Sequence, residues 1–120
     1  MSLSDNAIHD AMHGHRNRNL ALRAQFEKRG VNLDQPRSVD FHFWASTQRD
    51  AAVLARSLYE KGFLIHMLAP APGENAPDRW SIEGGLKIPL TLALGERLTE
   101  ELIKLASAED ATFDGWGTSI

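Results

Sequence analysis

The sequence predicts an α+β domain, one antiparallel sheet with helices packed on one side. Three observations lead to this prediction: strict apolar–polar alternation at the first strand, two amphipathic helix patterns, and a strand–helix–strand order that occurs twice. The chain has 120 residues, which suits a single domain with one core. Apolar residues make up 42% and charged residues 24%, values ordinary enough for a globular protein to argue against disorder.

Residues 6–30 form the first predicted helix, which Gly30 ends. The apolar residues in and just after it are Leu20, Leu22, Phe26 and Val31. Residues 9–18 have almost no apolar face, so we expect this half to fray or to wait for a partner. We therefore divide the chain into an N-terminal helical extension, residues 1–35, and a domain, residues 36–120.

Residues 39–46 alternate with a period of two, which indicates a half-buried strand. One side carries Val39, Phe41, Phe43 and Ala45; the other carries Asp40, His42, Trp44 and Ser46. Thr47 then begins a helix as its N-cap, with Asp50 completing a capping box. The helix pattern at i, i+3, i+4 and i+7 consists of Ala51, Leu54, Ala55 and Leu58, and Gly62 ends it.

The second half repeats this pattern. Residues 63–68 form a short apolar strand, followed by a loop that contains Pro70, Pro72, Gly73 and Pro77. Residues 79–87 alternate again, with Arg79, Ser81 and Glu83 opposed to Trp80, Ile82 and Gly84. Pro89 opens one helix with Leu94, Leu98, Leu102 and Leu105, in which Gly95 costs about 1 kcal/mol relative to Ala.

Residues 112–116 give the last strand, so the order from residue 39 onward is βαββαβ. Two right-handed units of this kind form a four-stranded antiparallel sheet with both helices on one face. The sequence therefore predicts a ferredoxin-like two-layer sandwich, with an extra N-terminal helix.

Charge and composition exclude several classes of function. Residues 1–37 carry six Lys and Arg against four Asp and Glu, whereas residues 38–120 carry seven against twelve. The acidic body disfavours direct nucleic-acid binding and suits a basic partner. The absence of cysteine excludes disulfides and thiolate chemistry. We find neither a signal-peptide pattern nor a membrane span, and expect a soluble cytoplasmic protein.

The sequence gives little support for a catalytic site or a metal site. Asp40, His42 and Ser81 could share the uncovered face of the sheet, but such a face offers no water-excluding pocket. His9 and His13 are one helical turn apart, but a bare HxxxH lacks the further ligands of true metal motifs. We expect no catalytic residue, no metal and no cofactor.

The outward side of the central strands is the candidate protein-binding patch. Its predicted residues are Asp40, His42, Trp44, Arg79 and Glu83, with Asp114 and Trp116 at the edge. An outward tryptophan is typical of a protein interface. An RNA recognition motif, which has the same βαββαβ order, would instead need several aromatic residues on this face, and only Trp44 is placed there. The alternative is that the N-terminal helix covers the face and buries Trp44.

Three segments carry a family resemblance: FDGWGT at residues 113–118, PRSVDF at residues 36–41, and the helix at residues 50–62. Over roughly residues 18–120 the chain resembles the regulator of ribonuclease E activity B (RraB) family, with FDGWGT as the most specific element. The resemblance implies a ferredoxin-like protein that binds the scaffold half of ribonuclease E, which includes arginine-rich stretches, and inhibits RNA cleavage. It supplies no catalytic motif.

Two functional hypotheses follow. The first is a non-enzymatic regulator that binds ribonuclease E, or a related RNA-degradation assembly, through the outward patch. The second is a small-ligand-binding or sensor domain that acts as an oligomer, as ferredoxin-like domains often do. The two glycines beside Trp116 also permit a purely structural role for residues 114–117, and both readings of that motif stay open.

Overall fold

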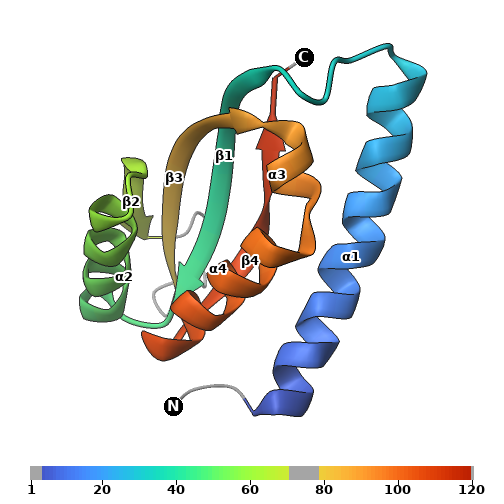
Figure 1. Cartoon of the computed structure of the whole chain (residues 1–120). Helices are drawn as coiled ribbons and strands as arrows, with labels where there is room; N and C mark the ends of the chain where they lie inside the picture. The colour runs from blue at the N-terminus through green and yellow to red at the C-terminus, as the bar shows by residue number, and fades with distance from the viewer. Residues whose placement is uncertain (1–3, 71–78, 120) are drawn as a thin grey trace.

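The computed structural model describes residues 4–70 and 79–119. It is an α+β structure with a single antiparallel sheet (Figure 1). The helices are α1 (Asp5–Lys28), α2 (Gln48–Glu60), α3 (Leu90–Leu94) and α4 (Glu96–Ala108). The strands are β1 (Pro36–Ala45), β2 (Leu64–Pro70), β3 (Trp80–Pro89) and β4 (Ala111–Thr118). The predicted strands and helices occur in the predicted order, except that two helices, α3 and α4, stand where one was predicted. The predicted loop after β2 falls largely on residues 71–78, outside the described residues.

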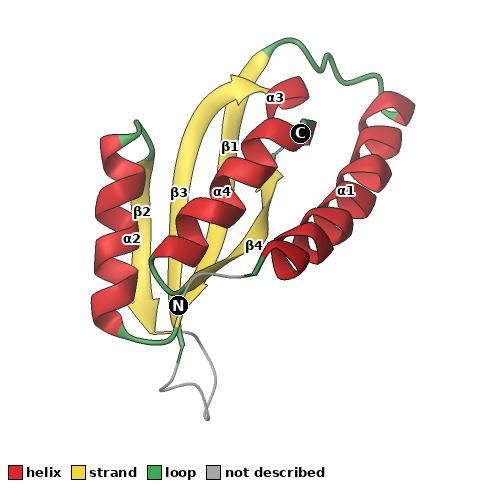
Figure 2. Ribbon diagram, turned by 60° about the horizontal axis from the view of Figure 1, so that its bottom comes forward, coloured by secondary structure: helices red, strands yellow, loops and turns green. Residues whose placement is uncertain are grey.

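The sheet has the strand order β2-β3-β1-β4, and every neighbouring pair is antiparallel. The two central strands are therefore β1 and β3, and the edges are β2 and β4. Helices α2, α3 and α4 lie on one side of the sheet, and α1 runs beside α4 near the β4 edge (Figures 1 and 2).

The core lies between the sheet and this helical layer. Every second residue of β1 is buried on that side, as the alternation predicted: Val39, Phe41, Phe43 and Ala45. The helix α2 contributes the residues at helical spacing: Ala51, Leu54, Ala55 and Leu58. Thr47 caps α2 by accepting a hydrogen bond from the Asp50 amide at 3.1 Å, as the capping-box pattern predicted.

The prediction of a single helix after Pro89 is wrong, because the helix is interrupted at Gly95. That residue is extended, with φ −76° and ψ 149°, and it separates α3 from α4. A Cβ at Gly95 would lie 3.3 Å from the Thr91 carbonyl oxygen, so the backbone here passes tightly over the preceding turn. The break lets Leu90 and Leu94 from α3, and Leu102 from α4, be buried together in the core.

The N-terminal helix differs from the expectation in two respects. Its first half does not fray, since Ile8, Ala11 and Met12 pack against the core and the helix is continuous to Lys28. Ser4 caps its start by accepting a hydrogen bond from the Ala7 amide. Leu20, taken as part of the apolar content of this helix, is 60% exposed. Among the described residues no helix has both the length and the apolar character needed to cross a membrane.

Candidate protein-binding face of the sheet

One face of the sheet is turned away from the helical layer, and we call it the open face. The β1–β3 register places Trp44 opposite Ser81, His42 opposite Glu83 and Asp40 opposite Gly85. Lys87, opposite Ser38, and Asp114 on β4 carry charge on this face. The residues at its centre are Asp40, His42, Trp44, His66, Arg79 and Glu83. Five of these six were predicted from the alternation of two strands.

Trp44 lies half-buried on the open face, beside a cation. The Cζ atom of Arg79 is 5.3 Å from the centroid of the Trp44 ring, which is a cation–π distance. Both residues, together with Asp114, line a hollow of about 350 Å³. The helix α1 contacts α3 and α4 and not this face, so the alternative in which it buries Trp44 is excluded.

Next to Trp44, the open face carries a cluster of two imidazoles and two carboxylates. The His66 Nε2 atom lies 3.2 Å from Asp40 Oδ1 and 3.5 Å from Glu83 Oε1. The His42 Nε2 atom lies 3.9 Å from the same Glu83 oxygen. His42 therefore faces Glu83, while the Ser81 hydroxyl points to Met67 Sδ at 3.6 Å, so Asp40, His42 and Ser81 do not form a catalytic chain.

The sequence analysis missed His66. It lies in a run that was read as a short apolar strand, and its neighbours Leu64 and Met67 are 68% and 42% exposed. Alternation within residues 63–68, with Phe63 and Ile65 on the core side, would have placed His66 outward. That signal was present, but an apolar run is commonly buried on both faces and hides it.

The predicted position of Trp116 at the edge of the outward patch is wrong, because Trp116 lies on the helical side of the sheet. It pairs with the core residue Phe41 and is 8% exposed. Its Nε1–H donates a 3.0 Å hydrogen bond to Asn19 Oδ1, and its ring lies 6.2 Å from the ring of Phe26. The helix α1 thus covers Trp116.

The rest of the FDGWGT motif is divided between the two faces. The β1–β4 register shifts by one residue between His42 and Phe43, so Asp114 is the extra, exposed residue of a bulge. Gly115 has φ 141°, and a Cβ there would collide with the Arg18 guanidinium, which donates to the Asp114 carbonyl at 2.6 Å. The glycine is required by both backbone conformation and space. These contacts support the structural reading of the motif.

His15 joins α1 to β4 on the covered side. Its ring stacks on Phe113 with centroids 4.7 Å apart, and its Nε2 is 3.2 Å from the Phe113 carbonyl oxygen, to which it donates as the Nε2–H tautomer. Burial lowers the pKa of His15, assisted by Arg18 and opposed by the Phe113 hydrogen bond and Asp114. In contrast, His9 and His13 are exposed on α1.

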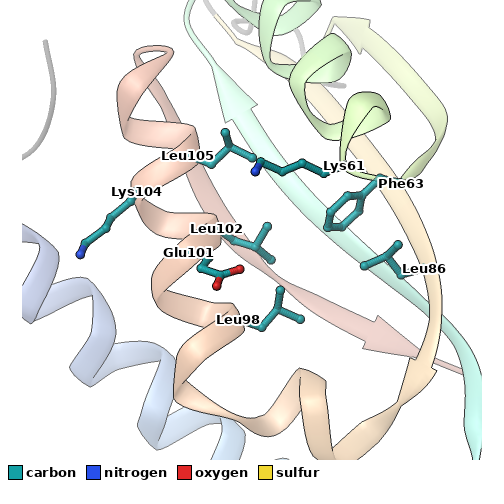
Figure 3. A pocket seen from close by; sticks show the side chains of 8 residues that line it. All are labelled: Lys61, Phe63, Leu86, Leu98, Glu101, Leu102, Lys104 and Leu105. Atoms are coloured by element: carbon teal, nitrogen blue, oxygen red, sulfur yellow. The ribbon is translucent and has the colours of Figure 1, made fainter.

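The helical layer has a separate apolar hollow, of about 720 Å³, between α4 and the turn that leads from α2 to β2. Figure 3 shows Leu98, Leu102 and Leu105 of α4 pointing across it toward Phe63 and Leu86. Charged residues border the hollow: Lys61, Glu101 and Lys104. Its volume falls within the range of small-molecule sites.

An α+β structure with a half-buried tryptophan among charged side chains on an uncovered sheet face belongs, by these features, with small binding domains. The sequence model of Regulator of ribonuclease activity B matches residues 17–118, and the chain belongs to this family. No curated protein matches the chain. The family assignment confirms the resemblance predicted from the three sequence segments and leaves residues 1–16 outside the match.

Proposed function

We propose that this protein is a non-enzymatic cytoplasmic regulator that binds ribonuclease E through the open face and inhibits its cleavage of RNA. The family to which the chain belongs consists of regulators of ribonuclease activity, which supports a protein partner in RNA degradation. The location of the site is inferred from Trp44, which α1 does not cover and which has charged residues beside it. Aromatic anchors of this kind dominate the energetics of protein interfaces.

The charge of the chain supports a basic partner. The body from residue 38 onward carries five more acidic than basic residues, and the open face carries Asp40 and Glu83 as well as the cations Arg79 and Lys87. Complementary charge raises association rates and disfavours wrong partners. The arginine-rich stretches that the resemblance implies for the ribonuclease E scaffold half fit this surface.

The proposal includes a fold assignment and a domain division. The strand order β2-β3-β1-β4, with α2 and α4 on one side, supports a ferredoxin-like domain at residues 36–120. Residues 1–35 are then an extension whose helix α1 covers Trp116 and leaves the open face available.

The test uses purified protein and purified ribonuclease E, full-length and truncated to its catalytic half. We expect the chain to bind and inhibit only the full-length enzyme in a titration with a fluorescent RNA substrate. Trp44→Ala should weaken binding by at least about tenfold. Tyr59→Ala is the matched control, since Tyr59 is an aromatic residue that is 68% exposed on α2, away from the open face. Equal binding by both variants would place the interface elsewhere.

The runner-up function, a small-ligand sensor, is favoured by the apolar hollow beside α4 (Figure 3). If it is correct, the chain should show no interaction with ribonuclease E and should retain a small molecule on purification. Leu98→Asp would then remove that ligand, while Trp44→Ala would not. Native mass spectrometry of the purified chain distinguishes these outcomes.

A further inference from the structure

We propose that Asp40, His66 and Glu83 on the open face form a binding site for a first-row divalent metal ion of the Zn²⁺ type. The proposal is independent of the partner, because it concerns the isolated chain. One ligand atom from each residue lies within 4.8 Å of the other two. The three residues come from three adjacent strands: β1, β2 and β3.

Two of the three ligand separations match those that a tetrahedral ion requires, and the third, between the two carboxylate oxygens, lies within 4.8 Å. Zn²⁺ binds His nitrogen and carboxylate oxygen at about 2.0–2.2 Å, which sets neighbouring ligand atoms about 3.3–3.6 Å apart in a tetrahedron. The His66 Nε2 atom is 3.2 Å from Asp40 Oδ1 and 3.5 Å from Glu83 Oε1. Binding one ion therefore requires the two carboxylate oxygens to come within the same range of each other, with the fourth position left to water.

Two local features of the backbone bring His66 to this position. The β2–β3 register shifts between Ile65 and Met67, which makes His66 the extra residue of a β-bulge. Bulges re-aim a side chain relative to the regular pleat.

Gly85 provides the space for the ring. Asp40 on β1 and Leu64 on β2 are paired with Gly85 from opposite sides, so the imidazole has to pass over β3 to reach Asp40. Two strand spacings separate β2 from β1, roughly 10 Å. A Cβ on Gly85 would lie 3.0 Å from His66 Cε1 and 3.3 Å from Asp40 Oδ1. The glycine thus keeps open the space in which the ligands meet.

The surroundings favour a cation. The Glu83 side chain is only 16% exposed, and its carboxylate faces the imidazoles of His66 and His42. Asp40 adds a second carboxylate, 43% exposed. A hollow of about 390 Å³ borders the cluster at Asp40, His66 and Gly85 and leaves it accessible to an ion; Lys87 is the cationic side chain among the residues that line it. The His42 Nε2 atom, 3.9 Å from Glu83 Oε1, lies next to that ligand and outside the set of three.

The ligand set selects the class of ion. Imidazole suits Zn²⁺ and its first-row neighbours, whereas Mg²⁺ and Ca²⁺ prefer oxygen alone. Because a ligating imidazole has to be deprotonated, the affinity should fall on acidification. The role is binding only: a divalent ion would neutralise the two carboxylate charges of the cluster on the open face.

The experiment is a calorimetric titration of the full chain with zinc chloride at neutral pH. We expect one site per chain, at least about tenfold weaker in His66→Ala and in Asp40→Asn. His9→Ala/His13→Ala is the matched control, which removes two exposed imidazoles on α1 and should leave this site unchanged. Far-UV circular dichroism confirms that each variant is folded.

A second readout identifies the ligand atom. In a ¹H–¹⁵N spectrum of the imidazoles, zinc should shift the His66 Nε2 resonance far more than those of the other four histidines. Gly85→Ala should weaken zinc binding while the Trp44-dependent contact with the partner is retained, which separates this proposal from the proposed function. The absence of zinc binding, or its loss only in the His9→Ala/His13→Ala variant, would overturn the assignment.

Discussion

Two tryptophans on neighbouring strands of the same sheet have opposite environments. Trp116 on β4 faces the helical layer, is 8% exposed, and has its indole N–H bonded to Asn19. Trp44 on β1 faces away from that layer, is half-buried, and contacts a cation. The comparison shows that the helices close one face of the sheet and leave the other uncovered, and our proposal assigns recognition to the uncovered face.

The largest expected effect is on stability, at Trp116. Trp116→Ala removes a buried ring that packs against Phe26, and it should lower the free energy of unfolding by ~3–5 kcal/mol. Trp44→Ala is the matched control with the same substitution on the open face, and it should cost about 1 kcal/mol or less. Urea denaturation followed by circular dichroism measures both. Equal losses at the two positions would contradict the division between the faces.

The next effect concerns the hydrogen bond that α1 makes with Trp116. Asn19 is buried, accepts from Trp116 Nε1 at 3.0 Å, and directs its Nδ2 toward Thr99 Oγ1 at 3.5 Å. Asn19→Ala leaves the indole N–H without this acceptor and should cost ~1–3 kcal/mol. A double-mutant cycle with Trp116→Phe, which lacks the N–H, should show that the loss is shared. Fully additive losses would mean that the hydrogen bond contributes nothing.

Much of this fold could be predicted from local patterns. The alternation in β1 assigned both faces of that strand correctly, and Thr47 with Asp50 marked the start of α2. The break at Gly95 was missed, because a glycine at helical spacing is compatible with a weak helix as well as with a break. Only the packing of α3 and α4 on the sheet decides between them.

The candidate site was less predictable, since two of its features depend on register. Trp116 was expected outward because no local pattern reveals the bulge at Asp114, which restores core-facing alternation for the residues that follow. The approach of His66 to Asp40 could not be predicted, because it depends on a bulge in β2 and on the space above Gly85, and neither is visible in a local pattern. The polar residue of α1 that bonds Trp116 is 97 positions away in sequence, beyond any spacing argument.

A smaller effect is expected in the pH dependence of stability. Burial lowers the pKa of His15 in the folded chain from the ordinary 6.5, so the unfolded chain binds the proton first as the pH falls. This contribution to stability is therefore complete above pH 6.5 and decreases below it. His15→Phe keeps the stacking on Phe113 and removes the titration, so its unfolding midpoint in urea should fall less between pH 7.5 and 5 than that of the wild type. His13→Gln, at an exposed position, should behave as the wild type does, and an identical pH dependence in His15→Phe would contradict the role of burial.

The smallest effect belongs to the open face itself. Arg79 lies over Trp44 at 5.3 Å, a contact at a solvent-accessible position that should contribute about 0.5–1 kcal/mol. Arg79→Ala should therefore change unfolding by no more than this, and the change should vanish in the Trp44→Ala background. Arg56→Ala is the matched control, because Arg56 is an exposed arginine on α2 that pairs only weakly with Glu60. A loss above 2 kcal/mol for Arg79→Ala would show that the open face contributes to stability as the covered face does, and it would remove the reason for assigning Trp44 to recognition.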